Sequence, residues 1–188
     1  MTTDAAHEFF LGSAGVAGAL IGLLFVAFSV AADRMREPEA SEIHAVRAGA
    51  TLTAFTNALS VSLFGLVPGM NVGDPALAVA LIGLLYIVAA TLRVYPQWRA
   101  KRIKTIELSF LAGLLVVFVF QLLAGIGLAR HPHNGGDLRT ICILVIVCFL
   151  IGISRAWELV GGPEVGFVHE VVGMLRGGRE SPAPGERD

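Results

Sequence analysis

The chain has 188 residues, of which 55% are hydrophobic and 15% are charged, and its formal net charge is −1. Soluble domains carry about 25% charged residues, so a soluble fold of this length could not bury so much apolar side chain. This composition excludes a cytosolic enzyme and a secreted disulfide scaffold, and the lack of excess positive charge excludes a nucleic-acid binder. We therefore expect an integral membrane protein.

Five apolar segments reach or approach the length of about 20 residues that a helix needs to cross a bilayer. No Lys or Arg precedes the first segment, so we expect a permanent helix there rather than a cleaved signal peptide. The fifth segment is the shortest, and Arg139 and Arg155 at its ends can reach the two interfaces. The predicted fold is an all-α integral membrane protein, a bundle of five transmembrane helices at about residues 9–32, 45–70, 75–95, 106–129 and 138–158.

Basic residues are distributed unevenly between the two sides of this topology. Twelve of the fourteen Lys and Arg residues lie after the first, third and fifth segments, and the other two lie between the fourth and the fifth. Cytoplasmic loops of membrane proteins carry an excess of Lys and Arg. We therefore expect the N-terminus outside and the C-terminus in the cytoplasm. The preference for arginine over lysine indicates a GC-rich bacterial genome, so the expected location is a bacterial cytoplasmic membrane.

Residues 1–160 form the predicted transmembrane domain, and residues 161–188 form a cytoplasmic tail. The sequence Gly161-Gly162-Pro163 interrupts helix formation after the fifth segment. Apolar residues then recur at helical spacing from Val165 to Leu175, which predicts a short helix on the membrane surface. The end of the tail is rich in proline and charge and predicts disorder.

The second segment carries the most polar face of the chain. Thr53, Thr56, Asn57 and Ser60 fall within an arc of about 100° on a helix. Polar side chains that face lipid are costly, so this face must meet protein or water. We consider two interpretations: hydrogen bonds between helices, or a wet surface that lines a path for ions or small solutes. The second interpretation requires an oligomer, because five helices are few for a pore.

Charged residues gather near the expected cytoplasmic ends of the segments. They are Arg47, Glu107, Arg155 and Glu158, and the last two are i, i+3 neighbours on one helix. One interpretation is an ion network that fixes the depth of the helices, and the other is a proton or ion relay. Gln121 lies deeper on the same helix face as Glu107, and we expect it to hydrogen-bond another helix.

The first segment is rich in small residues. Ala14, Gly18 and Gly22 recur every four residues, and Gly18 and Gly22 form a GxxxG motif. Small residues allow helix backbones to approach closely in lipid, where no hydrophobic force draws helices together. The motif predicts close helix packing, either within the chain or between copies of it.

The sequence contains no P-loop, HExxH or GxSxG motif. Two histidines in a loop, His131 and His133, could meet Asp137, His7 and Glu8, but this pattern is more typical of solvated loop residues than of a metal site. Cys142 and Cys148 lie in one apolar stretch and indicate neither a disulfide framework nor a zinc site. We therefore expect no catalytic site, no cofactor and no metal.

The stretch Phe9–Ser29 resembles the opening helix of a family of small bacterial polytopic membrane proteins that are usually described as hypothetical, and Ser62–Gly69 is similar to the end of their second helix. Some of these proteins are labelled modulators of a membrane-bound protease. The resemblance implies the architecture and supplies no site residues. We expect a non-enzymatic accessory or interaction protein in contact with the lipid bilayer and with either a second copy or another membrane protein. The alternative is a homo-oligomeric channel or transport component lined by the second segment.

Overall fold

The computed structural model describes residues 3–31, 38–99, 105–132 and 134–159 of the chain. All regular structure in these residues is helical, which confirms the all-α prediction. The helices are α1 (Thr3–Ala31), α2 (Pro38–Gly65), α3 (Gly73–Arg99), α4 (Thr105–Arg130) and α5 (Gly135–Leu159). The predicted tail, residues 161–188, lies outside the described residues.

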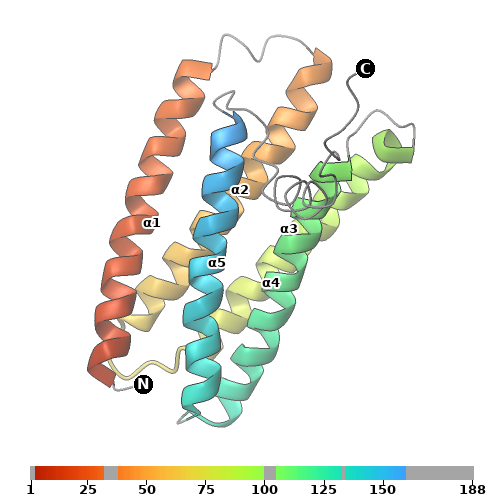
Figure 1. Cartoon of the computed structure of the whole chain (residues 1–188). Helices are drawn as coiled ribbons and strands as arrows, with labels where there is room; N and C mark the ends of the chain where they lie inside the picture. Colours follow the sequence, from red (N-terminus) through yellow and green to blue (C-terminus); the bar gives the residue numbers. More distant parts are fainter. Residues whose placement is uncertain (1–2, 32–37, 100–104, 133, 160–188) are drawn as a thin grey trace, which may run out of the picture.

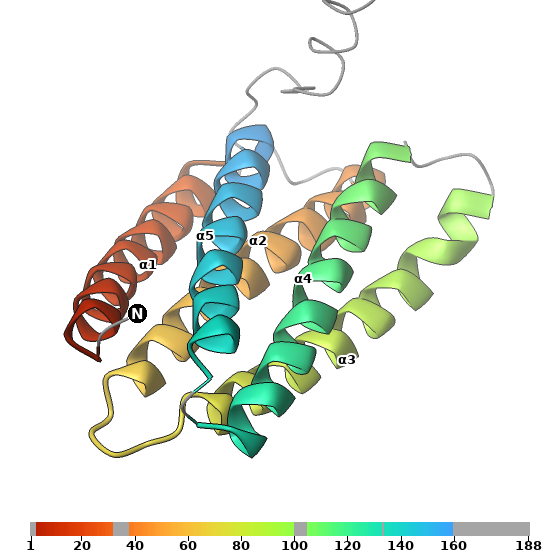
Figure 2. The same ribbon diagram turned by 60° about the horizontal axis from the view of Figure 1, so that its bottom comes forward.

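Consecutive helices run in opposite directions (Figure 1). The start of α1, the α2–α3 turn and the α4–α5 turn therefore lie together at one end of the bundle, which we call the turn end. Helices α3 and α4 lie on one side of α2 and α5, and α1 lies on the other side (Figure 2). Helix α2 contacts all four of the others.

Four of these helices are long and apolar enough to cross a membrane. Their apolar stretches are Asp4–Ser29 in α1, Gly73–Arg93 in α3, Phe110–Arg130 in α4 and Gly135–Glu158 in α5. The prediction of five spans is therefore confirmed for four segments, and it is not confirmed for the second. Helix α2 falls short because threonine, serine and asparagine residues lower its apolar content between Thr51 and Ser62.

Aromatic rings placed on glycines hold the helices close together. A methyl group at any of four glycines would overlap the ring of a neighbouring helix. The pairs are Phe10 on Gly65, Phe55 on Gly152, Tyr86 on Gly49 and Phe118 on Gly83. These pairs connect α1 to α2, α2 to α5, α3 to α2 and α4 to α3. Each interface thus depends on a glycine that lets a large ring approach the backbone.

The turn end is fixed by two asparagines. Asn71 accepts a hydrogen bond from the backbone N–H of Gly73 (3.0 Å) at the start of α3 and donates one to the carbonyl oxygen of Leu128 (3.2 Å) in α4. Asn134 caps α5 in the same way, because its side chain accepts the N–H of Gly136 (3.1 Å). The α2–α3 turn is therefore attached to the last turn of α4.

Candidate functional site

The centre of the bundle contains a pair of buried amides, Asn57 from α2 and Gln121 from α4. Asn57 donates from Nδ2 to Oε1 of Gln121 (2.8 Å), and Gln121 donates from Nε2 to Oδ1 of Asn57 (2.9 Å). Each residue is 1% exposed. The two side chains therefore satisfy each other without water.

The remaining amide hydrogens of this pair reach two more helices. Asn57 Nδ2 also donates to Sγ of Cys148 in α5 (3.2 Å), and Gln121 Nε2 also donates to the carbonyl oxygen of Ala76 in α3 (3.2 Å). Because a primary amide has two N–H donors, all four donors of the pair are used. The network joins α2, α3, α4 and α5, and it leaves no amide hydrogen to line a wet path.

The other members of the polar face of α2 do not share this environment. Thr53 is half-buried and donates to the carbonyl oxygen of Gly49 (2.7 Å), one turn earlier. Ser60 is half-buried and Thr56 is exposed on the outside of the bundle. The structure therefore separates the four predicted residues, and it brings Asn57 together with Gln121.

The charged residues predicted near the other end are described in part. Arg155 is 1% exposed and its Nη1 lies 2.6 Å from Oε2 of Glu158, so the i, i+3 pair forms. The guanidinium also lies over the ring of Phe110 in α4, 4.0 Å from its centroid. Arg47 and Glu107 belong to α2 and α4, but their side chains lie outside the described residues.

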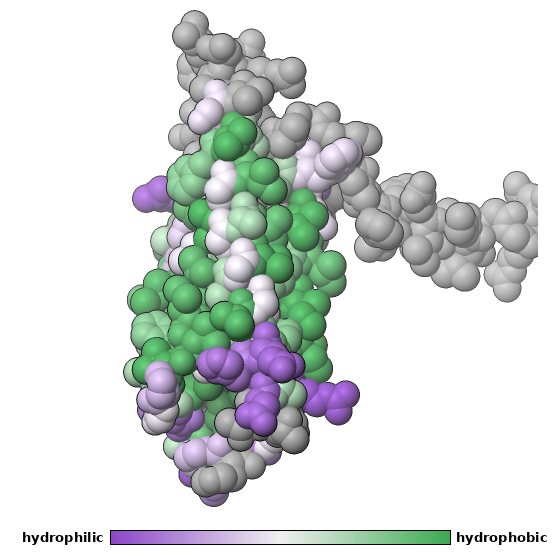
Figure 3. All heavy atoms as spheres, turned by 90° about the vertical axis from the view of Figure 1, so that its left-hand side faces the viewer, coloured by the Kyte–Doolittle hydropathy of each residue, from purple (hydrophilic) through white to green (hydrophobic). Residues whose placement is uncertain are grey.

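The glycines of α1 lie on its outer surface. Gly12, Gly15, Gly18 and Gly22 are all exposed, and a methyl group added at any of them would meet no atom within 4 Å. Figure 3 shows this face of α1 as a pale stripe on an otherwise apolar surface. Ala14 is half-buried. Gly18 and Gly22 therefore pack against nothing in the described part of the chain, whereas Gly49, Gly65, Gly83 and Gly152 of the other helices receive aromatic side chains.

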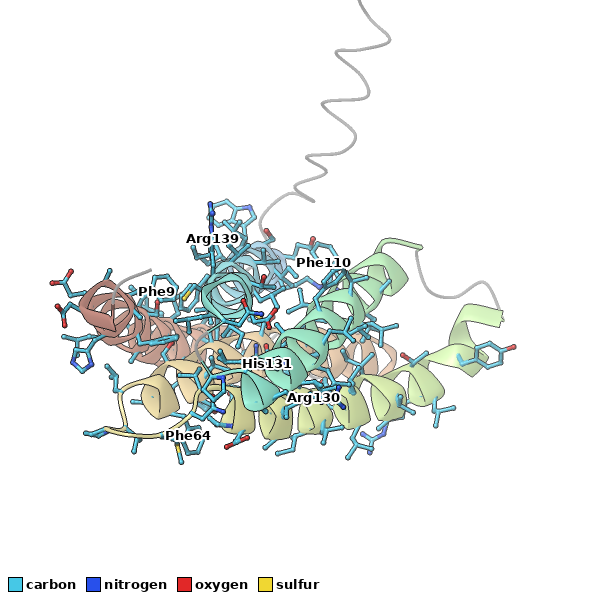
Figure 4. All side chains as sticks on the ribbon, turned by 90° about the horizontal axis from the view of Figure 1, so that it is seen from below. Phe9, Phe64, Phe110, Arg130, His131 and Arg139 are labelled. Atoms are coloured by element: carbon cyan, nitrogen blue, oxygen red, sulfur yellow. The ribbon has the colours of Figure 1, made fainter. Side chains whose placement is uncertain are left out.

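Polar residues lie at the turn end (Figure 4). Arg139 points outward from α5, and His131 lies in the α4–α5 turn. Asp137 accepts a hydrogen bond from Nδ2 of Asn134 (2.7 Å). Among the described residues, no group of three or more His, Cys, Asp or Glu side chains is placed to hold a metal ion. His133 lies outside those residues.

Sequence reasoning missed three participants in these sites. Cys148 and Phe110 look like ordinary apolar residues of membrane helices, and the carbonyl of Ala76 has no signature in the sequence. Ser62 was also missed: it is fully buried, and its hydroxyl oxygen has no hydrogen-bond partner in the described part of the chain.

No family model, no curated protein and no solved structure matches this chain. The resemblance of residues 9–29 and 62–69 to small bacterial membrane proteins therefore stays an expectation. What is identified is the architecture of the described residues, which are all-helical in their regular structure and include four helices long and apolar enough to cross a membrane.

Proposed function

We propose that the chain is a non-enzymatic accessory or interaction protein of a bacterial cytoplasmic membrane, which binds another transmembrane helix through the outer face of α1. The observation that carries this proposal is the row of exposed glycines at residues 12, 15, 18 and 22. Four glycines elsewhere in the fold admit an aromatic side chain of a neighbouring helix. Close backbone approach at small residues is what attracts helices to each other in lipid.

The position of α1 in the bundle supports the same proposal. Its contacts are with α2 and α5, so it lies at an edge. In its apolar stretch 22% of the residues are buried, against 33%, 39% and 44% in the other three candidate spans. Helix α1 thus offers the largest share of its surface to a partner, either a second copy or another membrane protein.

The proposed topology has five passes, with the N-terminus outside and the C-terminus in the cytoplasm. The distribution of basic residues along the sequence supports this orientation, because twelve of the fourteen follow the first, third and fifth apolar segments. Helix α2 is not apolar enough to be a span by composition. Its contacts with all four other helices and the enclosed position of Asn57 support a path through the protein rather than through lipid.

Association through α1 is tested with a photoreactive amino acid at Ala19, which is exposed beside the glycines, in cells that produce the full chain. We expect a cross-linked species heavier than the chain, and we expect Gly18→Leu to remove it. Val16→Leu is the matched control. Val16 is also exposed on α1, and this substitution adds bulk at a position away from Gly18. The proposal fails if Ala19 gives no protein adduct, or if both variants give the same adduct as the wild type.

The alternative function is a homo-oligomeric channel or transport component. The observation in its favour is Thr56, a polar residue exposed on the outside of α2. A path would then run between copies along Thr56 and Ser60, since Asn57 is enclosed. Ion flux from proteoliposomes tests this function. Flux by the wild type that Thr56→Leu abolishes would favour it over the accessory function.

A further inference from the structure

A half-open cavity of about 560 Å³ lies at the turn end. Its walls are the first two turns of α1, residues 65–72 around the α2–α3 turn, and the start of α5. The volume falls within the range of about 300–1,000 Å³ that is usual for sites of small ligands.

The cavity lies at the end of the bundle where the apolar stretches of three helices begin or come close to beginning. The apolar stretches of α1, α3 and α5 begin at Asp4, Gly73 and Gly135, which are part of the cavity walls or close to them. In a membrane, this end of the helices therefore meets the lipid headgroups. The apolar molecules that reach such a cavity are the acyl chains of the surrounding bilayer.

The lining has the amphipathic character of a phospholipid. Most turns are polar, but the α2–α3 turn presents Val67 and Met70, each 44% exposed, beside Leu66. Phe10 lies behind this lining, packed on Gly65 and 1% exposed. The polar lining residues are His7 and Asn134, from the polar segments that surround the bundle end. An acyl chain suits the first group, and the ester and phosphate region suits the second.

We propose that this cavity binds a membrane phospholipid, with part of one acyl chain against Leu66, Val67 and Met70 and the headgroup region beside His7 and Asn134. The bound lipid would connect α1 to the α2–α3 turn and to α5. This site goes beyond the proposed function and depends on the membrane location alone. It lies at the turn end, away from the exposed glycine at residue 22.

The test is retention of lipid by the full chain, purified in a mild detergent from membranes and measured by native mass spectrometry. Wild type should retain one phospholipid per chain. Met70→Trp and Val67→Trp place an indole at the mouth of the cavity, and each should lower occupancy by about tenfold or more, which is a loss of about 1.4 kcal/mol in binding. Because both residues are partly exposed, neither variant should disturb the helical content measured by circular dichroism.

The matched control is Leu85→Trp on α3, which is 71% exposed and does not line the cavity. This variant should retain lipid as the wild type does. The proposal is overturned if the wild type carries only detergent or no adduct, if both cavity variants keep the lipid, or if Leu85→Trp loses as much lipid as they do. Loss of α1 cross-linking with intact lipid retention would contradict the proposed function and leave this site supported.

Discussion

Replacing Asn57 by leucine should destabilise the bundle strongly, because the closed amide network loses one of its two members. The substitution removes three hydrogen bonds, two with Gln121 and one with Cys148. Interhelical hydrogen bonds in membrane proteins contribute about 0.6 kcal/mol each on average, which gives about 2 kcal/mol for three. The buried amide of Gln121 also loses two partners, at an additional cost of about 1–3 kcal/mol. We therefore expect a loss of about 3–5 kcal/mol in the free energy of unfolding.

A double-mutant cycle with Gln121→Leu isolates the contact between the two amides. In the double variant no amide stays buried without its partner, so its loss should be smaller than the sum of the two single losses by about 1–3 kcal/mol. Reversible unfolding in lipid bicelles, followed by circular dichroism, measures each free energy. Additive losses, or a loss below about 0.5 kcal/mol for Asn57→Leu, would refute a dry and closed network. They would mean that water satisfies Asn57.

Three further predictions follow from the packing, the buried ion pair and the topology. Gly83→Ala should lower the free energy of unfolding by about 1–3 kcal/mol, because the new methyl group overlaps an aromatic ring. Gly15→Ala is the control and should cause no loss. Equal melting temperatures for the two variants would contradict this account of the glycines. Glu158→Gln removes a charged partner of the buried guanidinium of Arg155 and should lower the free energy of unfolding by about 1–3 kcal/mol in the same assay. An unchanged free energy of unfolding would show that the pair is solvated. A reporter domain fused into the α3–α4 connection should give a cytoplasmic signal and one in the α4–α5 turn an external signal, and the reverse pattern would invert the proposed orientation.

Composition and segment length predicted the helices and four of the spans, because these features depend on local apolar content. The same criterion failed for the second segment, because the threonine, serine and asparagine residues between Thr51 and Ser62 lower its apolar content. Sequence spacing also predicted the pair of Arg155 and Glu158, which are neighbours on one helix. The partner of Asn57 was beyond such reasoning, because the rotation of α2 relative to α4 is set by packing across the bundle.

The sequence also does not indicate which glycines receive a side chain from another helix. Gly18 and Gly83 look equivalent in the sequence, as small residues within apolar helices. In the fold, Gly83 receives the ring of Phe118, whereas Gly18 faces outward. A glycine packs in the interior only where another helix supplies an aromatic residue, and that residue is distant in the sequence. A motif such as GxxxG therefore predicts a capacity for close approach without indicating the partner.

The closed amide network has a consequence for the order in which the protein is made. Asn57 is synthesised 64 residues before Gln121 and 91 residues before Cys148. At about 5–20 residues per second, roughly 3–13 s pass before the first of these partners leaves the ribosome. During that interval α2 carries an unsatisfied amide and lacks the apolar content that would hold it alone in hydrocarbon. In the proposed topology, α2 therefore reaches its final position after α4 and α5 have been synthesised, so the second helix of the chain is among the last to settle in the membrane.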